Sequence, residues 1–303
     1  MIERKPIKNR NPLVSVIMPV HNSGKYLSPA LNSVLNQTYK NFEFIIVDDA
    51  STDNSQTILK DYAKKYPKKI KLLKNTVNMG VSYSSNKAIS KSKGNYIARM
   101  DGDDLMFPER LELQVKFLEK NKGNVLVGGQ VVEISESGEF LGERKYPLTN
   151  EEIYKKMPIF MSVLQGATMI NKNLLPKDFV WYRNDLRVAE DMDLFFRLFK
   201  YGKFANLHSF ILSYRRHPFS ISRKWPKETF ALTNKCRVNA ILSYDYKPTA
   251  FAILMIALQT IAVALLPEKF VVLMYVKLRG IKLVDESIKT KALKLNTVSS
   301  IVL

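Results

Sequence analysis

The strongest chemical signal in this sequence is a run of three carboxylates within four residues, Asp101-Gly102-Asp103-Asp104. Carboxylates this close repel one another unless a cation lies between them. Mg²⁺ and Mn²⁺ prefer oxygen ligands, and proteins often hold them with one or two carboxylates together with substrate phosphates. Gly102 permits the sharp turn that lets Asp101 and Asp103 face the same space. The run indicates a divalent-cation site, although a polar turn after a strand has the same composition.

Other polar groups also follow apolar runs. Pro19 and Asn22 lie at the end of one run, and Asp49 follows the next. A carboxylate at position 49 can accept hydrogen bonds from a nucleobase or from a ribose hydroxyl. Ser51 and Asp53, a few residues further on, are typical helix caps. We therefore expect a binding function for Asp49 and a capping function for its neighbours.

Two candidate groups lie in the second half of the chain. The pair Glu190-Asp191 begins a predicted helix, where the helix dipole favours negative charge whether or not the pair has a catalytic function. The segment Tyr214–Pro218 has cations that are suited to closing over a diphosphate, and His217 within it is a candidate metal ligand. A surface turn with a hydrogen-bonded histidine explains this segment equally well. Trp181 and Tyr182 are candidates for stacking on an acceptor sugar, with core packing the simpler function for Trp181.

Apolar runs and amphipathic stretches alternate through the first 120 residues. The apolar runs predict strands at Leu13–Val20, Phe42–Val47, Ile70–Leu73 and Tyr96–Met100. The amphipathic stretches predict helices at Lys25–Asn36, Asp53–Lys65, Gly80–Lys91 and Pro108–Lys120. This order is typical of an α/β fold with a mostly parallel sheet, flanked by helices and joined by right-handed crossovers. Ligands bind beyond the carboxyl ends of such strands, so the acidic strand ends should meet in one crevice.

The second half of the chain is less regular. We expect a hairpin of Val125–Ile134 and Phe140–Tyr146 that turns at Ser137-Gly138, and a short strand at Gly166–Ile170. A helix from Glu190 to Tyr201, two short strands within Ala205–Arg216 and a helix at Lys227–Leu242 complete the predicted elements.

The C-terminal tail has a different composition. Phe251–Leu266 is uncharged and the apolar character resumes at Phe270–Val276, whereas Lys277–Lys294 carries six basic and two acidic side chains. A bilayer core requires about 20 apolar residues in a helix, so a shallow or re-entrant hairpin is as plausible as a span. The basic segment favours anionic lipid headgroups. A pair of buried helices is the alternative to membrane contact.

Bulk composition restricts the class of protein. The 303 residues are 46% hydrophobic and 25% charged, which predicts a mostly globular chain. The single cysteine, Cys236, and the polar segment Met1–Asn11 predict a cytosolic protein without a disulfide or a secretory signal. The net charge of +19 fits nucleic acid, an anionic membrane, a phosphate-bearing ligand or a solvated lysine-rich surface. No nucleic-acid-binding motif is present in the sequence, so we do not expect a nucleic-acid partner.

Taken in order, the motifs resemble those of a family 2 glycosyltransferase of the GT-A fold. Five pieces carry the resemblance, and their order and spacing are more specific than any one of them: Val14–Asn22, Ile45–Asp53, Asn78–Gly80, Gly94–Asp104 and Ala189–Asp193. The resemblance covers about residues 12–222, with a donor half at about 12–105 and an acceptor half at about 106–222. Residues 1–11 form a basic N-terminal segment, and residues 223–303 an apolar and basic helical region.

The resemblance implies a function for each site residue. Pro19 and Asn22 would border the nucleotide, Asp49 would bind the base or ribose, and Asp101 would lie near the ribose. Asp103 would hold Mn²⁺ or Mg²⁺ at the diphosphate, with His217 as a further metal ligand, and Asp191 would be the catalytic base. Where the family often has an arginine, this chain has Lys87 as the candidate substitute.

The expected reaction is inverting transfer from a nucleotide-diphosphate sugar, typically a UDP-sugar, to an acceptor hydroxyl. The apolar, basic tail favours a glycan or lipid-linked acceptor at the cytoplasmic face of a membrane, as in surface polysaccharide or glycolipid assembly. A nucleotidyltransferase would use the same carboxylates, but it would need a glycine-rich basic loop after the first strand. A non-catalytic basic binding protein would leave the ordered acidic motifs unexplained.

Overall fold

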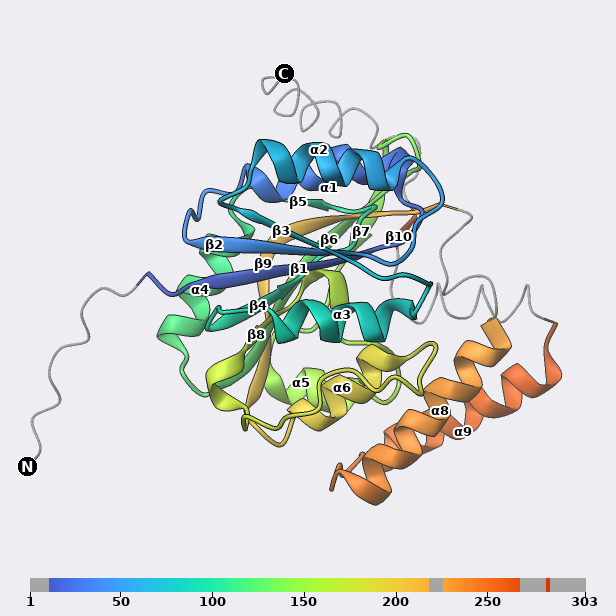
Figure 1. Ribbon diagram of the computed structural model, residues 1–303. Coiled ribbons are helices and arrows are strands. Elements are labelled where there is room, and N and C mark those ends of the chain that lie inside the picture. Colours follow the sequence, from blue (N-terminus) through green and yellow to red (C-terminus); the bar gives the residue numbers. More distant parts are fainter. Residues whose placement is uncertain (1–10, 218–225, 268–281, 284–303) are drawn as a thin grey trace, which may run out of the picture.

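The computed structural model describes residues 11–217, 226–267 and 282–283 of the chain. Figure 1 shows a twisted central sheet with helices on both faces and a pair of helices, α8 and α9, beside it.

The first half of the chain forms four parallel strands in the order β4-β1-β2-β3. Their bounds are β1 Val14–Val20, β2 Phe42–Asp48, β3 Ile70–Lys74 and β4 Tyr96–Arg99. The central strands are apolar and buried on both sides, as parallel sheets require. Helices α1 Gly24–Leu35 and α2 Ser55–Lys65 cover one face, and α3 Gly80–Ser90 covers the other (Figure 1). The predicted β-α-β order is confirmed here.

Beyond β4 the sheet becomes mixed. Strand β8 pairs antiparallel with both β4 and β6, β7 pairs antiparallel with β6, and β9 runs parallel to β6. The remaining elements of this half are β5 Leu105–Met106, α4 Arg110–Lys120, β6 Asn124–Ile134, β7 Phe140–Arg144, α5 Asn150–Lys156, β8 Met169–Asn171, α6 Glu190–Leu198 and β9 Lys203–Arg215. The predicted hairpin of β6 and β7 is confirmed, with Gly138 at a positive φ of 94° in its turn.

Two strand predictions in this half are wrong in detail. Ala205–Arg216 does not hold two short strands, because β9 is continuous over 13 residues. His208 and Ser209, in the middle of β9, are polar and exposed, so they interrupt the apolar pattern that predicts a strand. Register shifts against β6 keep the strand continuous there. The predicted strand at Gly166–Ile170 begins instead with a short 3₁₀ helix at Gln165–Ala167, and the strand follows at Met169–Asn171.

The C-terminal region forms two antiparallel helices and one short strand. Helix α8, Pro226–Ser243, confirms the predicted helix, and α9 spans Ala250–Leu265 with the Thr249 hydroxyl accepting from the Ala252 amide at 3.1 Å. Among the helices in the described ranges, none is long and apolar enough to cross a bilayer. Lys282 and Leu283 form β10 on the edge strand β7, so this part of the predicted helical region is a strand. Phe270–Val276 and the rest of Lys277–Lys294 lie outside the described residues.

Candidate active site

The parallel strands bring the donor-side candidates to one edge of the sheet. Pro19 pairs with Val47 across β1 and β2, and Ile17 pairs with Arg99 across β1 and β4. The segments that follow these strands carry Asn22, Asp49 and Asp101, which therefore leave the sheet at the same edge. The acidic loop also packs against the loop after β1, since a Cβ added to Gly102 would lie 3.3 Å from Ser23 Oγ.

The Asp49 carboxylate is buried and accepts three hydrogen bonds from the protein. Its Oδ1 accepts from Asn75 Nδ2 at 2.7 Å and from the Met79 amide at 2.8 Å, and its Oδ2 accepts from the Gly80 amide at 2.8 Å. These bonds join the end of β2 to the first turn of α3, a function that the sequence did not indicate. Lys87 donates to Asn75 Oδ1 at 2.8 Å and so supports the same cluster. Contact of Asp49 or Lys87 with a donor stays a prediction.

Three non-glycine residues with positive φ lie beside the candidate site. Asn22 has φ 51°, Ala50 has φ 54° and Ala189 has φ 62°. Asparagine adopts this region readily, and the Asn22 Oδ1 accepts from the Thr52 amide at 2.8 Å. Alanine does not, and such a conformation costs about 1–3 kcal/mol, which the surrounding structure must offset. Ala50 follows Asp49 and Ala189 precedes Glu190, so the strain borders both halves of the site. This backbone strain could not be predicted from the sequence, because alanine gives no sign of a positive φ.

Two buried arginines lie beneath the acidic loop. Arg99 Nη2 lies 2.7 Å from Asp101 Oδ1, and Arg99 is 2% exposed. Arg110 is fully buried and donates to the carbonyl oxygens of Gly166 at 2.7 Å and of Arg99 at 2.8 Å. Burial lowers the pKa of Arg110 to about 9, and the charges of Asp104 and Asp101 oppose that shift. The two arginines hold positive charge under the carboxylates, and single-sequence reasoning did not find them.

The far end of β9 holds the acidic loop from the other side. Arg215 donates its amide to Asp104 Oδ1 at 2.8 Å and its Nε to the Asp103 carbonyl at 2.9 Å. His217 Nε2 lies 2.8 Å from Asp103 Oδ2, and the imidazole lies beside the Tyr26 ring at 5.1 Å between centroids. The structure thus brings the predicted metal-binding residues Asp103 and His217 into direct contact.

The donor set of the acidic loop fits a divalent cation. Burial raises the pKa of Asp104 well above its usual range, and the charges of Asp103 and Asp101 raise it further. Such concentrated negative charge is what a cation relieves. Within the described ranges, no three His, Cys, Asp or Glu side chains gather into a metal site of their own. Asp103 and His217 offer an oxygen and a nitrogen ligand, and Mg²⁺ usually completes its shell with phosphate oxygens and water.

The Glu190-Asp191 pair lies at the start of α6, close to the acidic loop. Asp191 Oδ1 accepts from the Met192 amide at 2.8 Å. Burial, together with the charge of Asp191, raises the pKa of Glu190 to about 8. The charge of Arg99 lowers this pKa and the charge of Asp101 raises it. Tyr182 is buried, which raises its pKa, and the charges of Arg99 (lowering it) and of Glu190 and Asp191 (raising it) also act on its hydroxyl. Glu190 therefore lies within electrostatic reach of Asp101 in the acidic loop.

Of the two aromatic candidates for acceptor stacking, Tyr182 does not fit that function, and Trp181 fits the simpler prediction of core packing. Tyr182 is only 3% exposed, so its ring offers no face to a sugar. Trp181 is half-buried with its ring 5.5 Å from that of Phe179, which fits the packing function.

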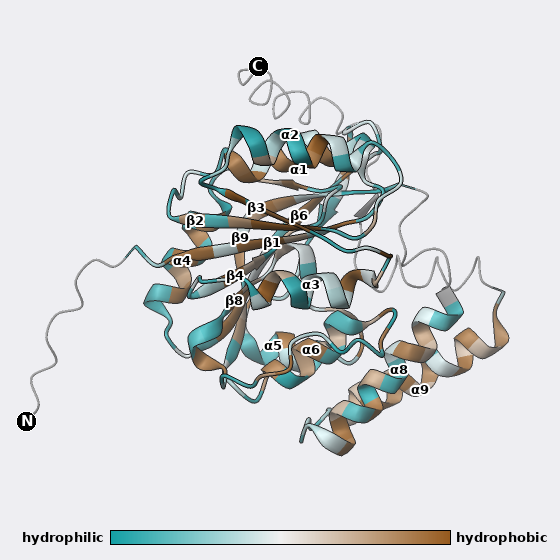
Figure 2. Cartoon of the chain, viewed as in Figure 1, coloured by the Kyte–Doolittle hydropathy of each residue, from teal (hydrophilic) through white to brown (hydrophobic). Residues whose placement is uncertain are grey.

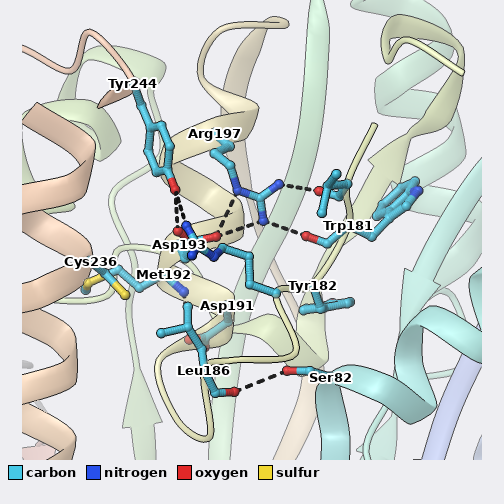
Figure 3. A network of polar contacts seen from close by, with 12 residues as sticks. Ser82, Trp181, Tyr182, Leu186, Asp191, Met192, Asp193, Arg197, Cys236 and Tyr244 are labelled. Carbon is cyan, nitrogen blue, oxygen red and sulfur yellow. Dashed lines mark hydrogen bonds and ion pairs between the residues drawn. The ribbon is translucent and has the colours of Figure 1, made fainter. Parts of the chain in front are cut away.

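A buried polar network holds α6 in place (Figure 3). Asp193, which is fully buried, accepts from Arg197 Nε at 2.8 Å and from the Tyr244 hydroxyl at 2.8 Å. Arg197 Nη2 donates to the Trp181 carbonyl at 2.5 Å, and Cys236 of α8 contacts the Ala189 carbonyl at 3.6 Å. The helix that carries Asp191 is thus joined to the preceding loop and to α8, and α8 belongs to the support of the site.

Comparison with known proteins agrees with this arrangement. The family model for glycosyl transferase family 2 matches residues 15–182. The Bacillus subtilis (strain 168) protein "Putative glycosyltransferase EpsE" is 37% identical over 240 residues, which are 78% of this chain and 82% of that protein. "Uncharacterized glycosyltransferase MJ1057" of Methanocaldococcus jannaschii is 36% identical over 210 residues, 67% of this chain and 71% of that protein.

Solved structures share the fold at lower identity. The crystal structure of S. aureus TarS 1-349 in complex with UDP-GlcNAc has a TM-score of 0.59 at 21% identity, over 80% of this chain and 70% of that one. Mannosyltransferase PcManGT from Pyrobaculum calidifontis, in complex with GDP-Man and Mn²⁺, has a TM-score of 0.56 at 16% identity, over 88% and 79%. The fold is that of the GT-A glycosyltransferases, the chain is a glycosyltransferase, and it belongs to glycosyl transferase family 2.

Proposed function

We propose that this enzyme transfers a sugar from a UDP-sugar to an acceptor hydroxyl with inversion, in a reaction that depends on a divalent cation. The observation that carries the proposal is the meeting of two carboxylate groups from distant parts of the chain. Asp103 of the acidic loop contacts His217, and the charges of Arg99 and Asp101 act on the pKa of Glu190 in the second group. Sugar transfer needs one group at the leaving diphosphate and another at the attacking hydroxyl.

The donor would bind at the carboxyl edge of the parallel strands. We assign residues 12–105 to donor binding, with Pro19, Asn22 and Asp49 around the nucleoside and Asp101 near the ribose. The shared edge of β1, β2 and β4 supports this assignment. The UDP-GlcNAc complex of TarS supports the choice of a UDP-sugar, because the two chains have the same fold.

Asp191 would act as the catalytic base. Because burial raises the pKa of Glu190 to about 8, Glu190 holds a proton at neutral pH, and Asp191 is the carboxylate left to accept one. The acceptor hydroxyl gives its proton to Asp191 as its oxygen attacks the anomeric carbon. Attack from the side opposite the leaving diphosphate inverts the anomeric configuration. The second half of the chain, at about residues 106–222, would bind the acceptor.

Asp103 and His217 would hold Mn²⁺ or Mg²⁺. When bound, such a cation offsets the negative charge that the departing nucleoside diphosphate gains in the transition state. Arg215 keeps Asp103 and Asp104 in place through the bonds described above. The chain itself therefore positions both metal ligands from β9.

The acceptor would be a glycan or a lipid-linked glycan at the cytoplasmic face of a membrane, in the assembly of a surface polysaccharide or glycolipid. The uncharged helix α9 and the basic composition of Lys277–Lys294 support this location. The test of the function itself does not require the natural acceptor.

A thermal-shift panel of sugar nucleotides, with and without Mn²⁺, tests donor and cation together. We expect a UDP-sugar to raise the Tm only when Mn²⁺ is present. Analysis of turnover products then separates the reaction classes. Free UDP and a product of inverted anomeric configuration support the proposal, whereas pyrophosphate would indicate a nucleotidyltransferase and overturn it.

A further inference from the structure

Helix α9 exposes an apolar face to solvent. Six of its large apolar residues are between 50% and 77% exposed, and besides Ile253 five of them form a series, at Phe251, Leu254, Leu258, Ile261 and Leu265. Their spacing of three and four residues places them along one stripe of the helix. The helix has no charged residue anywhere in its 16 positions. A monomeric soluble protein rarely presents so continuous an apolar stripe.

The polar residues of α9 fix this orientation. Gln259 is 3% exposed and donates to the Ile159 carbonyl at 3.0 Å on the protein side of the helix. Thr260 accepts from Asn234 Nδ2 at 3.2 Å and ties α9 to α8. The helix therefore directs its glutamine inward and its leucines outward, the reverse of an ordinary surface helix.

The apolar face continues onto α8. Val238, Ile241 and Leu242 are exposed, and a hollow of about 230 Å³ between the helices is lined by Val238 and Ile241 from α8 and by Ile253 from α9. Figure 2 shows the hydrophobic colouring along α9 beside α8, on helices that stand clear of the sheet. We call these exposed apolar residues of α8 and α9 the hairpin face.

Length and charge identify what the hairpin face contacts. A 16-residue helix is about 24 Å long, less than the roughly 30 Å of a bilayer core, so α9 fits along a membrane surface rather than across it. The chain carries a net charge of +19. Exposed Lys235 lies one turn before Val238, and exposed Lys247 lies just before α9. Apolar side chains flanked by lysines are typical of helices that lie on anionic lipid.

We propose that the hairpin face docks on an anionic membrane, with α8 and α9 lying in the plane of the headgroups. Cys236 of α8 contacts Ala189, and Tyr244, which directly follows α8, contacts Asp193, so the docked helices hold the end of α6 that carries Asp191. Docking would place the site beside a lipid-linked acceptor, and in this respect the inference rests on the proposed function. The binding of membrane itself does not depend on sugar transfer.

Vesicle flotation of the full chain tests the docking. We expect the protein to float with vesicles of 70:30 POPC:POPG, and to bind them more tightly than pure POPC vesicles and more weakly at 0.5 M salt. The double variant Leu254→Gln, Leu258→Gln should bind at least about tenfold more weakly, because it removes half-exposed apolar side chains from the stripe. Val180→Gln is the matched control, since Val180 is 64% exposed and lies outside both helices. It should bind like the unmodified protein.

Several outcomes would overturn the docking. Absence of the unmodified protein from the floated POPG vesicles is one, and undiminished binding of the double variant is another. A dimer in sedimentation velocity that the double variant dissociates, without vesicle binding, would assign the hairpin face to a second copy of the chain. Circular dichroism checks the fold of the variant. If the variant unfolds, hydrogen exchange of residues 250–265 in the unmodified protein decides, since vesicles should slow it and unchanged exchange contradicts docking.

The thermal shift with UDP-sugars separates the two proposals. Donor binding without vesicle binding rejects the docking alone. Vesicle binding without any donor response rejects the proposed function and leaves the docking intact.

Discussion

The two halves of the site are held together over very different distances along the chain. In the donor half, His21 contacts Asp49 across 28 positions, and Asp49 accepts from Met79 across 30. In the catalytic half of the site, made of the acidic loop together with Glu190, Asp191 and His217, Arg215 reaches Asp104 across 111 positions, and His217 reaches Asp103 across 114. A β-α-β unit returns the chain to the same sheet edge about every 30 residues. The donor half is therefore built by a local repeat, and the catalytic half only when distant segments meet.

This difference predicts where the enzyme is sensitive. Changes at the long-range contacts should impair turnover or metal use, whereas changes at the local contacts should mainly reduce stability. Normal turnover and normal metal use after substitutions in the catalytic half would contradict this division between the two halves.

The largest effect is expected from Asp191→Asn. If Asp191 accepts the proton of the acceptor hydroxyl, turnover should fall by about 10²–10⁴-fold, the range for loss of a general base. Donor binding, measured by the thermal shift with UDP-sugar and Mn²⁺, should remain. Asp185→Asn is the matched control, because Asp185 is an exposed carboxylate paired with Arg183. Near-normal turnover of Asp191→Asn would remove Asp191 from the mechanism.

The next effect concerns the cation. His217→Ala should raise the Mn²⁺ concentration needed for half-maximal turnover by at least about 10–100-fold, the range for loss of a group that supports a metal site, because it removes a proposed ligand together with the partner of Asp103. Asp103→Asn should abolish the Mn²⁺-dependent part of the donor thermal shift. His208→Ala, at an exposed position of β9, provides the control. An unchanged Mn²⁺ requirement in His217→Ala would leave the imidazole with only its hydrogen bond to Asp103.

The regular half of the fold could be predicted from the sequence, and the reason is physical. Short β-branched runs such as Ile45–Val47 indicate buried strands through their local pattern, and parallel strands place Asp49 and Asp101 at one edge. The buried arginines could not be predicted, because nothing near Arg110 in the sequence shows that its partners are the carbonyls of Gly166 and Arg99. The positive φ of Ala189 could not be predicted either, because alanine rarely adopts it, and the Ala189 carbonyl contacts Cys236 of α8, 47 positions away.

A third prediction uses the pH dependence of stability. The folded-state pKa of Glu190 is raised to about 8, above the ordinary value of about 4.3. Between these values the folded protein keeps a proton that the unfolded chain releases, so stability falls as pH rises through that window. Glu190→Gln cannot release a proton, and its Tm should depend less on pH and exceed that of the unmodified protein at pH 8.5. Glu151→Gln on exposed α5 is the control. Parallel Tm profiles for the Glu190 variant and the unmodified protein would contradict the burial of an ionisable Glu190.

A smaller effect is expected from Tyr244→Phe. The variant removes one hydrogen bond to the buried carboxylate of Asp193, which keeps its ion pair with Arg197. We expect a loss of about 1–2 kcal/mol in the free energy of unfolding, measured by urea denaturation. An equal loss of stability accompanied by reduced turnover would show that α8 supports the catalytic half. Unchanged stability would mean that the hydrogen bond from Tyr244 to Asp193 adds nothing to the other contacts that join α8 and α6.

The smallest effect should come from the donor half, at Asp53. Its Oδ1 accepts from the Ser55 amide at 3.0 Å and its Oδ2 from the Gly24 amide at 2.9 Å, so one carboxylate caps α1 and α2 together. Burial alone would raise the pKa of Asp53, but the hydrogen bonds from Ser55 and Gly24 hold it below the usual value.

Asp53→Asn should therefore lower the free energy of unfolding by about 1 kcal/mol at neutral pH, with little change in turnover. The difference should disappear in acid. A carboxylate whose pKa is lowered by folding stabilises the fold at pH values above its unfolded-state pKa, and this stabilisation is lost as the pH falls through the folded-state pKa. Asp61→Asn, at an exposed position of the same helix α2, is the control. A large loss of turnover in Asp53→Asn would show that local caps also position the donor, and the division between a locally built half and a long-range half would then no longer separate stability from catalysis.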